Sequence, residues 1–245
     1  MHDSPAAAHG AAHNPALLHH FATEGQQRNS ASLGMWVFLA QEVMFFGGLF
    51  CAYLIYRLKF FGDFGAASQS LNITLGATNT IVLIGSSLTV VFAVWAAKQG
   101  KRSMLLINLV LTLILGCAFL GIKAVEYRDK FREHHVPGAN FDFKCEAPGH
   151  PDVLVECHIP GNRDIAVNQR HAEMFFSLYF IMTGLHALHM IIGIGLFLWL
   201  LIMAWKGRYT PQYNTPIEIG GLYWHFVDLV WIYLFPLLYL IDRHP

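Results

Sequence analysis

The chain has 245 residues, of which 55% are hydrophobic and 13% are charged. An average soluble domain carries about 25% charged residues, so this composition is typical of a membrane protein. Sixteen basic and sixteen acidic residues balance to a formal net charge of zero. This balance excludes the basic surface that nucleic-acid-binding proteins need, so we expect no nucleic acid among the partners.

Residues 1–32 form a polar N-terminal segment that is rich in histidine and alanine. The segment lacks the apolar core of roughly 7–15 residues that marks a secretory signal peptide. We therefore interpret it as a solvated, His-rich tail. We expect the remainder, residues 33–242, to form one transmembrane domain.

Five apolar stretches are long enough to cross a bilayer as helices, at about residues 33–56, 73–97, 104–125, 173–205 and 220–241. A hydrocarbon core of about 30 Å requires about 20 apolar residues, because the backbone must satisfy its own hydrogen bonds there. The sequence therefore predicts an all-α fold, a polytopic membrane protein with five transmembrane helices in a bundle. The fourth stretch exceeds one bilayer crossing, so it should tilt or project.

A long extramembrane loop is expected at residues 127–172, and it contains Cys145 and Cys157. Three interpretations of these cysteines remain open. A disulfide would close a short loop and stabilise the fold by about 3 kcal/mol. A metal site could add His150 and His158, although the usual close pair of cysteine ligands is missing. Two free thiols are the third interpretation, and the disulfide is the one we favour.

The orientation in the membrane is predicted from the distribution of basic residues and cysteines. Lysine and arginine favour the cytoplasmic side, and the short connection at 97–103 is densely basic. The 127–172 loop holds more bases in total, but it mixes them with acids, and its cysteines fit an oxidising compartment. We therefore expect a cytoplasmic N-terminus, a periplasmic C-terminus and a periplasmic 127–172 loop.

Glu42 lies inside the first apolar stretch, about nine residues from its start and hence ~13 Å deep. A charged group at the bilayer centre costs at least about 2.5–3.5 kcal/mol, so a buried acid needs a reason. One interpretation is a neutral carboxyl that hydrogen-bonds a neighbouring helix. The other is a group that exchanges protons or contacts lipid. The two interpretations are compatible.

Two further pairs of ionisable residues have helical spacing inside the apolar stretches. Lys123 and Glu126 are three residues apart and can form an ion pair on one helical face, most simply as a structural contact. His186 and His189 also share a face, and each needs a hydrogen-bond partner in lipid. Glu42 or Glu126 from another helix would serve.

The last apolar stretch repeats this spacing with His225 and Asp228, and Glu218 lies just outside it. The aspartate can hydrogen-bond the imidazole three residues away, or it can face another helix. No metal ligands are expected in this chain.

Three classes of function compete for such a bundle. A haem protein would need two histidines at one depth, but His189 and His225 differ in depth by ~16 Å at the helical rise. A small transporter would often show internal repeats and broken helices, which the sequence lacks. A non-redox subunit of a larger membrane enzyme fits best.

Four stretches carry a resemblance to a known family: QEVMFFGGLF (41–50), KAVEY (123–127), TGLHALHMIIG (183–193) and IEIGGLYWHFVDLVW (217–231). They occur in the family's order, and each lies in a different predicted helix. The chain resembles subunit III of the haem–copper oxidases in its bacterial five-helix form, over about residues 33–242.

The resemblance implies a subunit of an aerobic terminal oxidase, a cytochrome c oxidase that couples O2 reduction to proton pumping in the bacterial cytoplasmic (inner) membrane. Haem and copper are then expected only in subunits I and II, and this chain has no cofactor and no catalytic residue. It would pack on subunit I, contact subunit II and small subunits, bind phospholipid and support proton uptake. The residues implied in proton uptake or lipid association are Glu42, Glu126, His186, His189, Glu218, His225 and Asp228.

Two features depart from the family pattern or divide its branches. The 127–172 loop is longer than the family usually has, and we expect it to contact a neighbouring subunit or an electron-donor complex. Quinol oxidases often have aspartate where Glu42 stands, so the glutamate favours a cytochrome c oxidase. The partner of a quinol oxidase or of a nitric oxide reductase is the alternative, and a small transporter is a more distant one.

Overall fold

The computed structural model describes residues 21, 23–133, 135–138, 141–147, 150–159, 162–211 and 213–240, without the side chains of 24, 145–147, 150–155, 159 and 162–165. In chain order the elements are α1 (Glu24–Lys59), α2 (Phe61–Gln69), α3 (Ile73–Lys98), α4 (Arg102–Arg132), β1 (Lys144–Ala147), β2 (His150–Glu156), β3 (His158–Ile159), β4 (Asn162–Ala166), α5 (Gln169–Trp205), α6 (Thr215–Phe235) and the π-helical turn η1 (Pro236–Leu240).

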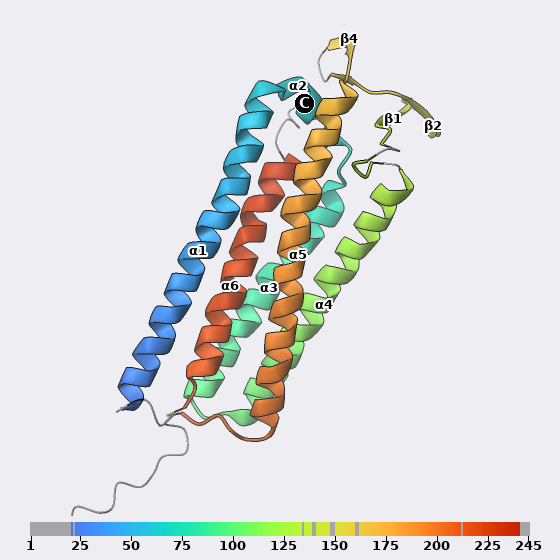
Figure 1. Ribbon diagram of the computed structural model, residues 1–245. Helices are drawn as coiled ribbons and strands as arrows, with labels where there is room; N and C mark the ends of the chain where they lie inside the picture. Colours follow the sequence, from blue (N-terminus) through green and yellow to red (C-terminus); the bar gives the residue numbers. More distant parts are fainter. Residues whose placement is uncertain are drawn as a thin grey trace, which may run out of the picture.

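Five helices in this part of the chain are long and apolar enough to span a membrane: α1, α3, α4, α5, and α6 with its continuation η1. They run side by side along the long axis of the molecule (Figure 1). This arrangement confirms the predicted all-α bundle of five transmembrane helices.

The helices extend beyond the predicted apolar stretches. Helix α1 begins at Glu24, so residues 24–32, which we assigned to the polar tail, are helical. The hydroxyl of Thr23 caps this helix by accepting a hydrogen bond from the Gln26 amide at 3.1 Å. Helix α4 continues to Arg132 and α5 begins at Gln169, which shortens the connecting loop from 127–172 to 133–168. Apolarity marks the thickness of the bilayer, whereas a helix can continue into water with polar residues.

Helix α2 is a short element that the apolar pattern did not predict. It follows α1 directly and packs against α5 at the end of the bundle where the strands lie (Figure 1). Its own residues Phe64 and Ala67 are buried, and the hydroxyl of its Ser68 donates to the carbonyl of Leu238 at 3.0 Å. Nine residues are too few for a span, so a search for spans does not find such a helix.

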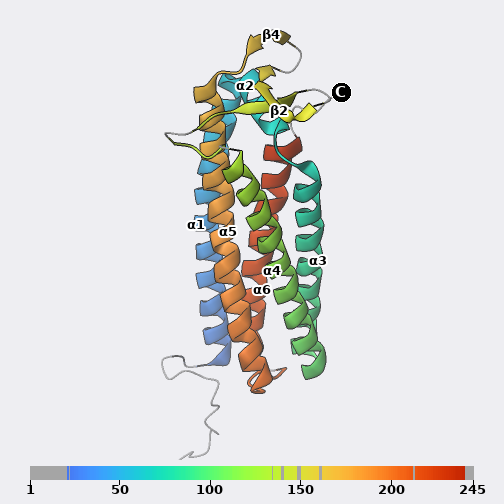
Figure 2. The same ribbon diagram turned by 90° about the vertical axis from the view of Figure 1, so that its right-hand side faces the viewer.

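The bundle is held together by close contacts among α3, α4, α5 and α6. Helix α3 packs on α4 and α6, and α5 packs on α4 and α6, while α1 lies along α6 and α5. A turned view shows α1 with α5 on one side and α3 on the other (Figure 2). A β-carbon at Gly116 would come within 2.8 Å of the Trp224 ring, so this glycine makes room for the central tryptophan.

The loop between α4 and α5 contains strands where the sequence predicted only an extended loop. Strands β1 and β2 form one antiparallel pair, and β3 and β4 form another. Cys145 lies opposite Val155 in the first pair. These short pairs lie outside the bundle, beyond the ends of α4 and α5 (Figure 1).

Candidate functional site

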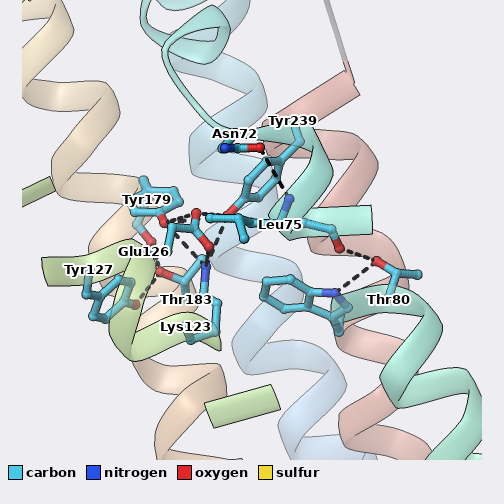
Figure 3. Close-up of polar contacts among 11 residues, drawn as sticks. Asn72, Leu75, Thr80, Lys123, Glu126, Tyr127, Tyr179, Thr183 and Tyr239 are labelled. Carbon is cyan, nitrogen blue, oxygen red and sulfur yellow. Dashed lines mark hydrogen bonds and ion pairs between the residues drawn. The ribbon is translucent and has the colours of Figure 1, made fainter. Parts of the chain in front are cut away.

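The bundle interior contains ionisable side chains at several depths, and each group has a different set of partners. The most densely bonded group consists of Lys123, Glu126, Tyr179 and Tyr239, which we name the Lys123 cluster (Figure 3). Its members come from α4, α5 and η1. Lys123 and Glu126 are each 3% exposed, so both charges are removed from solvent and lipid.

Every polar atom of the Lys123 cluster has a partner. The ammonium of Lys123 donates to Glu126 Oε2 at 3.0 Å, to the Tyr239 hydroxyl at 3.0 Å and to the Tyr179 hydroxyl at 3.3 Å. Glu126 Oε1 accepts from Tyr179 at 2.7 Å and also from Tyr239. A buried ion pair is tolerated when hydrogen bonds satisfy its remaining atoms, as they do here.

Aromatic rings complete the surroundings of the lysine. The Lys123 ammonium lies 4.9 Å from the ring centre of Trp231 and 5.4 Å from that of Tyr127. Such distances allow cation–π attraction. Tyr127 is itself held by a 2.6 Å hydrogen bond to the Thr183 hydroxyl (Figure 3). The predicted Lys123–Glu126 pair is thus confirmed, and its full bonding is that of a structural contact between helices.

Glu42 meets His189 across the α1–α5 contact, with 3.2 Å between Glu42 Oε2 and His189 Nε2. Glu42 lies 18 residues from the start of α1 and His189 lies 16 from the end of α5. At 1.5 Å per residue these positions are ~27 Å and ~24 Å from the same end of the bundle. The expectation that a glutamate from another helix would partner one of the paired histidines is therefore confirmed for His189.

The Glu42–His189 contact requires one proton. His189 Nδ1 lies 2.8 Å from the Leu185 carbonyl, which can only accept, so Nδ1 carries a hydrogen. A neutral imidazole then presents a lone pair at Nε2, and it can approach the carboxyl only if that carboxyl is protonated. Otherwise the imidazole is protonated and the carboxyl is ionised. In both states the carboxyl and the Nε2 atom hold one proton in total, whereas removal of that proton would place a lone pair against a carboxylate.

His186 has a different partner from the one we expected. Its Nε2 lies 3.1 Å from the carbonyl of Val227 and donates to it, so neither Glu42 nor Glu126 is its partner. The ring is 1% exposed and packs edge-on against Phe119. Its Nδ1 has no hydrogen-bond partner among the described residues. Helical spacing placed His186 and His189 on one side of α5, but one imidazole faces α6 and the other faces α1.

His225 and Asp228 lie on α6 where it packs against α3. His225 Nδ1 is 2.7 Å from the hydroxyl of Ser87, so the imidazole bonds a serine of α3 and not the aspartate three residues away. Asp228 is 3% exposed, and neither of its carboxyl oxygens has a hydrogen-bond partner in the described part of the chain. Ser87 is a residue that sequence reasoning missed, because serine in an apolar stretch also fits simple helix packing.

Glu218 lies apart from these groups, at the end of the bundle where α1 begins. Its carboxylate pairs with Lys98 at 2.8 Å and with Arg28 at 3.4 Å. These contacts join α6 to α3 and α1 at the membrane boundary.

The cysteines fall into two classes. Cys51 and Cys117 are free and exposed on the outside of the bundle. Cys157 is disulfide-bonded and its side chain is 2% exposed. The side chain of Cys145 lies outside the described residues, as does that of His150. The Cys145–Cys157 pairing therefore stays a prediction.

The described residues contain no group of three or more histidine, cysteine, aspartate or glutamate side chains that could hold a metal ion. The three histidines of the predicted apolar stretches, His186, His189 and His225, each have a separate partner: Val227, Glu42 and Ser87 respectively. The absence of a cofactor from this chain stays a prediction.

This geometry defines a multi-pass membrane protein whose ionisable groups are bonded to one another inside the bundle. A family model described as cytochrome c oxidase subunit III matches residues 18–136 and 168–242. The chain belongs to the cytochrome c oxidase subunit III family. The unmatched residues 137–167 fall in the loop between α4 and α5, where we expected a departure from the family.

Curated relatives agree with this assignment. The chain is 33% identical to cytochrome c oxidase subunit 3 of Corynebacterium diphtheriae over 216 residues, which cover 87% of this chain and 89% of the relative. It is 30% identical to a probable cytochrome c oxidase subunit 3 of Nocardia farcinica over 213 residues, with the same coverage. A quinol oxidase subunit 3 of Bacillus spizizenii is 28% identical over 208 residues, or 85% of each chain.

Proposed function

We propose that this chain is the redox-silent third subunit of a proton-translocating cytochrome c oxidase in a bacterial cytoplasmic membrane. It packs on subunit I, contacts subunit II and small subunits, binds phospholipid and supports proton uptake. The electron-transfer and O2 chemistry then belong to haem and copper in subunits I and II. Membership in the subunit III family supports the assignment to this complex.

The observation that carries the proton-uptake role is the Glu42–His189 pair. Two ionisable groups share one proton near the middle of the bundle, and their side chains keep 11% and 13% exposure. A purely structural pair could be almost completely buried within the protein, as Lys123 and Glu126 are. The partial exposure leaves the pair open to lipid or to subunit I along the edge of α1.

The distribution of charged residues at the two ends of the bundle supports the orientation that we propose. At the end where α1 begins, Lys101, Lys206 and Arg208 are exposed cations, and Glu218 neutralises part of the remaining charge. At the opposite end Lys130 and Lys144 pair with acids, at 2.6 Å and 2.5 Å. The short, basic connections at the first end, with Lys98, Lys101 and Arg102 in one and Lys206 and Arg208 in the other, support a cytoplasmic location for it. The N-terminus is then cytoplasmic, and the strands and the C-terminus are periplasmic.

Substitution of Glu42 tests the support role. Glu42→Gln keeps the volume and the hydrogen-bonding capacity but cannot carry the shared proton. The initial rate of O2 consumption should remain at the wild-type value, while the oxidase should lose activity faster during turnover. Glu42→Leu, which also removes the polar contact, should in addition weaken retention of the subunit. Both variants are compared with wild type in the same membranes.

The outcome that contradicts this role is equally clear. If Glu42→Gln abolished the initial rate while the complex remained fully assembled, the pair would act directly in catalysis. If neither variant changed activity decay or subunit retention, the pair would have no role in supporting turnover.

A quinol oxidase is the second candidate, and it is favoured by the similarity to the Bacillus spizizenii subunit. The glutamate at position 42 favours the cytochrome c oxidase. Identification of the chains that co-purify with this subunit decides between them. A copper-containing subunit II indicates cytochrome c as the donor, whereas a subunit II without copper indicates quinol. A partner of the nitric oxide reductase type would contradict both.

The segment 137–167 supports one further part of the proposal. Because the family model does not match it, family membership implies no role for it. We assign it to contact with a neighbouring subunit or with the electron-donor complex on the periplasmic side. Deletion of the segment should leave the bundle assembled and weaken that contact, as measured by co-purification.

A further inference from the structure

The interface between α3 and α6 contains an acid whose bonding differs from that of every other acid described above. Both carboxyl oxygens of Asp228 are buried without a hydrogen-bond partner among the described residues. An unpartnered buried polar group costs free energy, and an unpartnered carboxylate costs far more than a neutral carboxyl. In the packed bundle Asp228 is therefore favoured as a protonated carboxyl, and the residues around it decide whether that proton can leave.

Ser87 connects Asp228 to a second ionisable group. Its hydroxyl lies close enough to the Asp228 carboxyl to interact with it, but its hydrogen bond at 2.7 Å is to His225 Nδ1. A serine hydroxyl can rotate, donating to one neighbour while accepting from the other. Ser87 can thus exchange its hydrogen bond between the carboxyl and the imidazole without movement of the helices.

The three residues differ in exposure, which gives the set an inner end at Asp228 and an outer end at His225. Asp228 is 3% exposed, whereas Ser87 and His225 are only half-buried. The imidazole and the serine thus lie between the outer side of the bundle and the buried carboxyl, and a route to Asp228 can pass through them. His225 Nε2 makes no hydrogen bond within the described part of the chain, so it is available to a proton donor.

We propose that Ser87, His225 and Asp228 form a proton-binding site, in which His225 and Ser87 relay a proton between the outer side of the bundle and the Asp228 carboxyl. A proton binds His225 Nε2, the Nδ1 proton passes to Ser87 Oγ, and the hydroxyl proton of Ser87 passes to Asp228. Only N–H and O–H bonds form and break, and the imidazole ends neutral in its other tautomer. Release of the proton follows the same steps in reverse.

The other buried ionisable groups close to α6 have partners of their own. Within the spans Glu42 pairs with His189, His186 donates to a backbone carbonyl, and Lys123 pairs with Glu126. At the end of the bundle Glu218 pairs with Lys98 and Arg28. None of these groups supplies a hydrogen bond to Asp228. The relay therefore depends on Ser87 and His225.

This inference deepens the proton-uptake support proposed above, and its test measures protonation instead of turnover, so that each can fail without the other. The assembled oxidase is placed in lipid nanodiscs, and the carbonyl stretch of protonated carboxyls is followed by infrared spectroscopy after transfer to D2O. The Asp228 band is identified by its loss in Asp228→Asn. Its shift in D2O then reports how fast the carboxyl proton exchanges.

Three variants separate a relay from a passive buried acid. Ser87→Ala removes the bridging hydroxyl. It should slow exchange at Asp228 by about tenfold or more, because no hydroxyl then passes the proton between the imidazole and the carboxyl. His225→Gln should slow it similarly. Ser86→Ala is the matched control, since that neighbouring hydroxyl contacts Trp224 and not His225. It should leave the exchange rate unchanged.

Two outcomes overturn the proposal. One is a carboxyl spectrum that Asp228→Asn does not alter, which would mean that Asp228 holds no proton. The other is an exchange rate that is the same in Ser87→Ala, Ser86→Ala and wild type, which would make Asp228 a buried acid with no relay. If Asp228→Asn prevented assembly, Asp228→Glu would identify the band by shifting its frequency, and the serine comparison on the native aspartate would then decide.

Discussion

Helix α4 and its C-cap residue, Glu133, carry two lysine–glutamate pairs with the same three-residue spacing and different surroundings. Lys123 and Glu126 are each 3% exposed and lie 3.0 Å apart. Lys130 and Glu133 lie 2.6 Å apart two turns later, where the helix leaves the bundle; the Lys130 side chain is 7% exposed there, but the Glu133 side chain is 46% exposed. The first pair is enclosed by tyrosines, whereas the second contacts the backbone of Ser70 and the ring of His135.

The difference shows that spacing predicts contact and environment sets its energetic consequence. A surface ion pair contributes about 0–1 kcal/mol, because water already solvates both charges well. Breaking a buried pair leaves one charge without compensation and costs about 3–5 kcal/mol. The two pairs on α4 should therefore respond to equivalent substitutions with effects of different size.

The largest effect is expected for Lys123→Met, which leaves Glu126 buried without its cation. The variant should lower the stability of the subunit by about 3–5 kcal/mol, as measured by thermal unfolding of the purified complex and by retention of this chain. Lys98→Met is the control, because it breaks a pair whose lysine is 51% exposed. An equal loss in both variants would contradict the distinction. The double variant Lys123→Met with Glu126→Leu should recover much of the loss.

A smaller effect is expected for Tyr239→Phe, which sharpens the role of the tyrosines. This hydroxyl bonds both charged members of the Lys123 cluster. Hydrogen bonds to charged groups contribute about 1.5–3 kcal/mol each, against about 0.5–1.5 kcal/mol for neutral ones. Tyr223→Phe is the matched comparison, because that hydroxyl donates at 3.0 Å to the neutral carbonyl of His189. If Tyr223→Phe destabilised the complex more, charge would not dominate the cluster.

The smallest effect is expected at the exposed carboxylate of Glu133, and it depends on pH. Partial burial alone would raise the pKa of Glu133, but hydrogen bonds from His135 and Lys130 outweigh it and lower the pKa to about 2, from an ordinary 4.5. Because the folded-state pKa is depressed, the stabilisation is present above pH 4.5 and is lost as pH falls toward 2. Solvent screening limits it to about 0.2–1 kcal/mol.

This pH effect is measured as the difference in unfolding temperature between wild type and Glu133→Gln. The difference should be small but present at pH 6 and should vanish near pH 2. A difference that grew as the pH fell would contradict the assignment of Glu133 as the titrating group.

Much of the bundle could be predicted from the sequence, because lipid imposes a simple rule on length and apolarity. All five spans and the Lys123–Glu126 contact were predicted correctly. Helix α2 and the polar extensions of α1, α4 and α5 were not, since they lie outside the bilayer where that rule does not apply. The strands of the 133–168 loop were missed for the same reason.

The sites were predicted less completely, because their partners come from distant parts of the chain. His189 contacts Glu42, as expected. His186, however, bonds a backbone carbonyl, and His225 bonds Ser87. The sequence did not predict Tyr179 and Tyr239 as partners of Lys123 and Glu126, because tyrosine is common near membrane boundaries for other reasons. Helical spacing shows which residues share a side of one helix, and it leaves open which helix that side meets.

The π-helical turn η1 has a consequence for the order in which the protein is made. Tyr239 lies in this turn, after Pro236, which cannot donate a backbone hydrogen bond. The ribosome delivers α4 and α5 to the membrane before η1 has been synthesised. Until then the Lys123–Glu126 pair lacks one of its hydroxyl donors, and the cluster cannot close. Closure of the Lys123 cluster is thus coupled to translation of η1, because Tyr239 supplies a hydroxyl that α4 and α5 cannot supply.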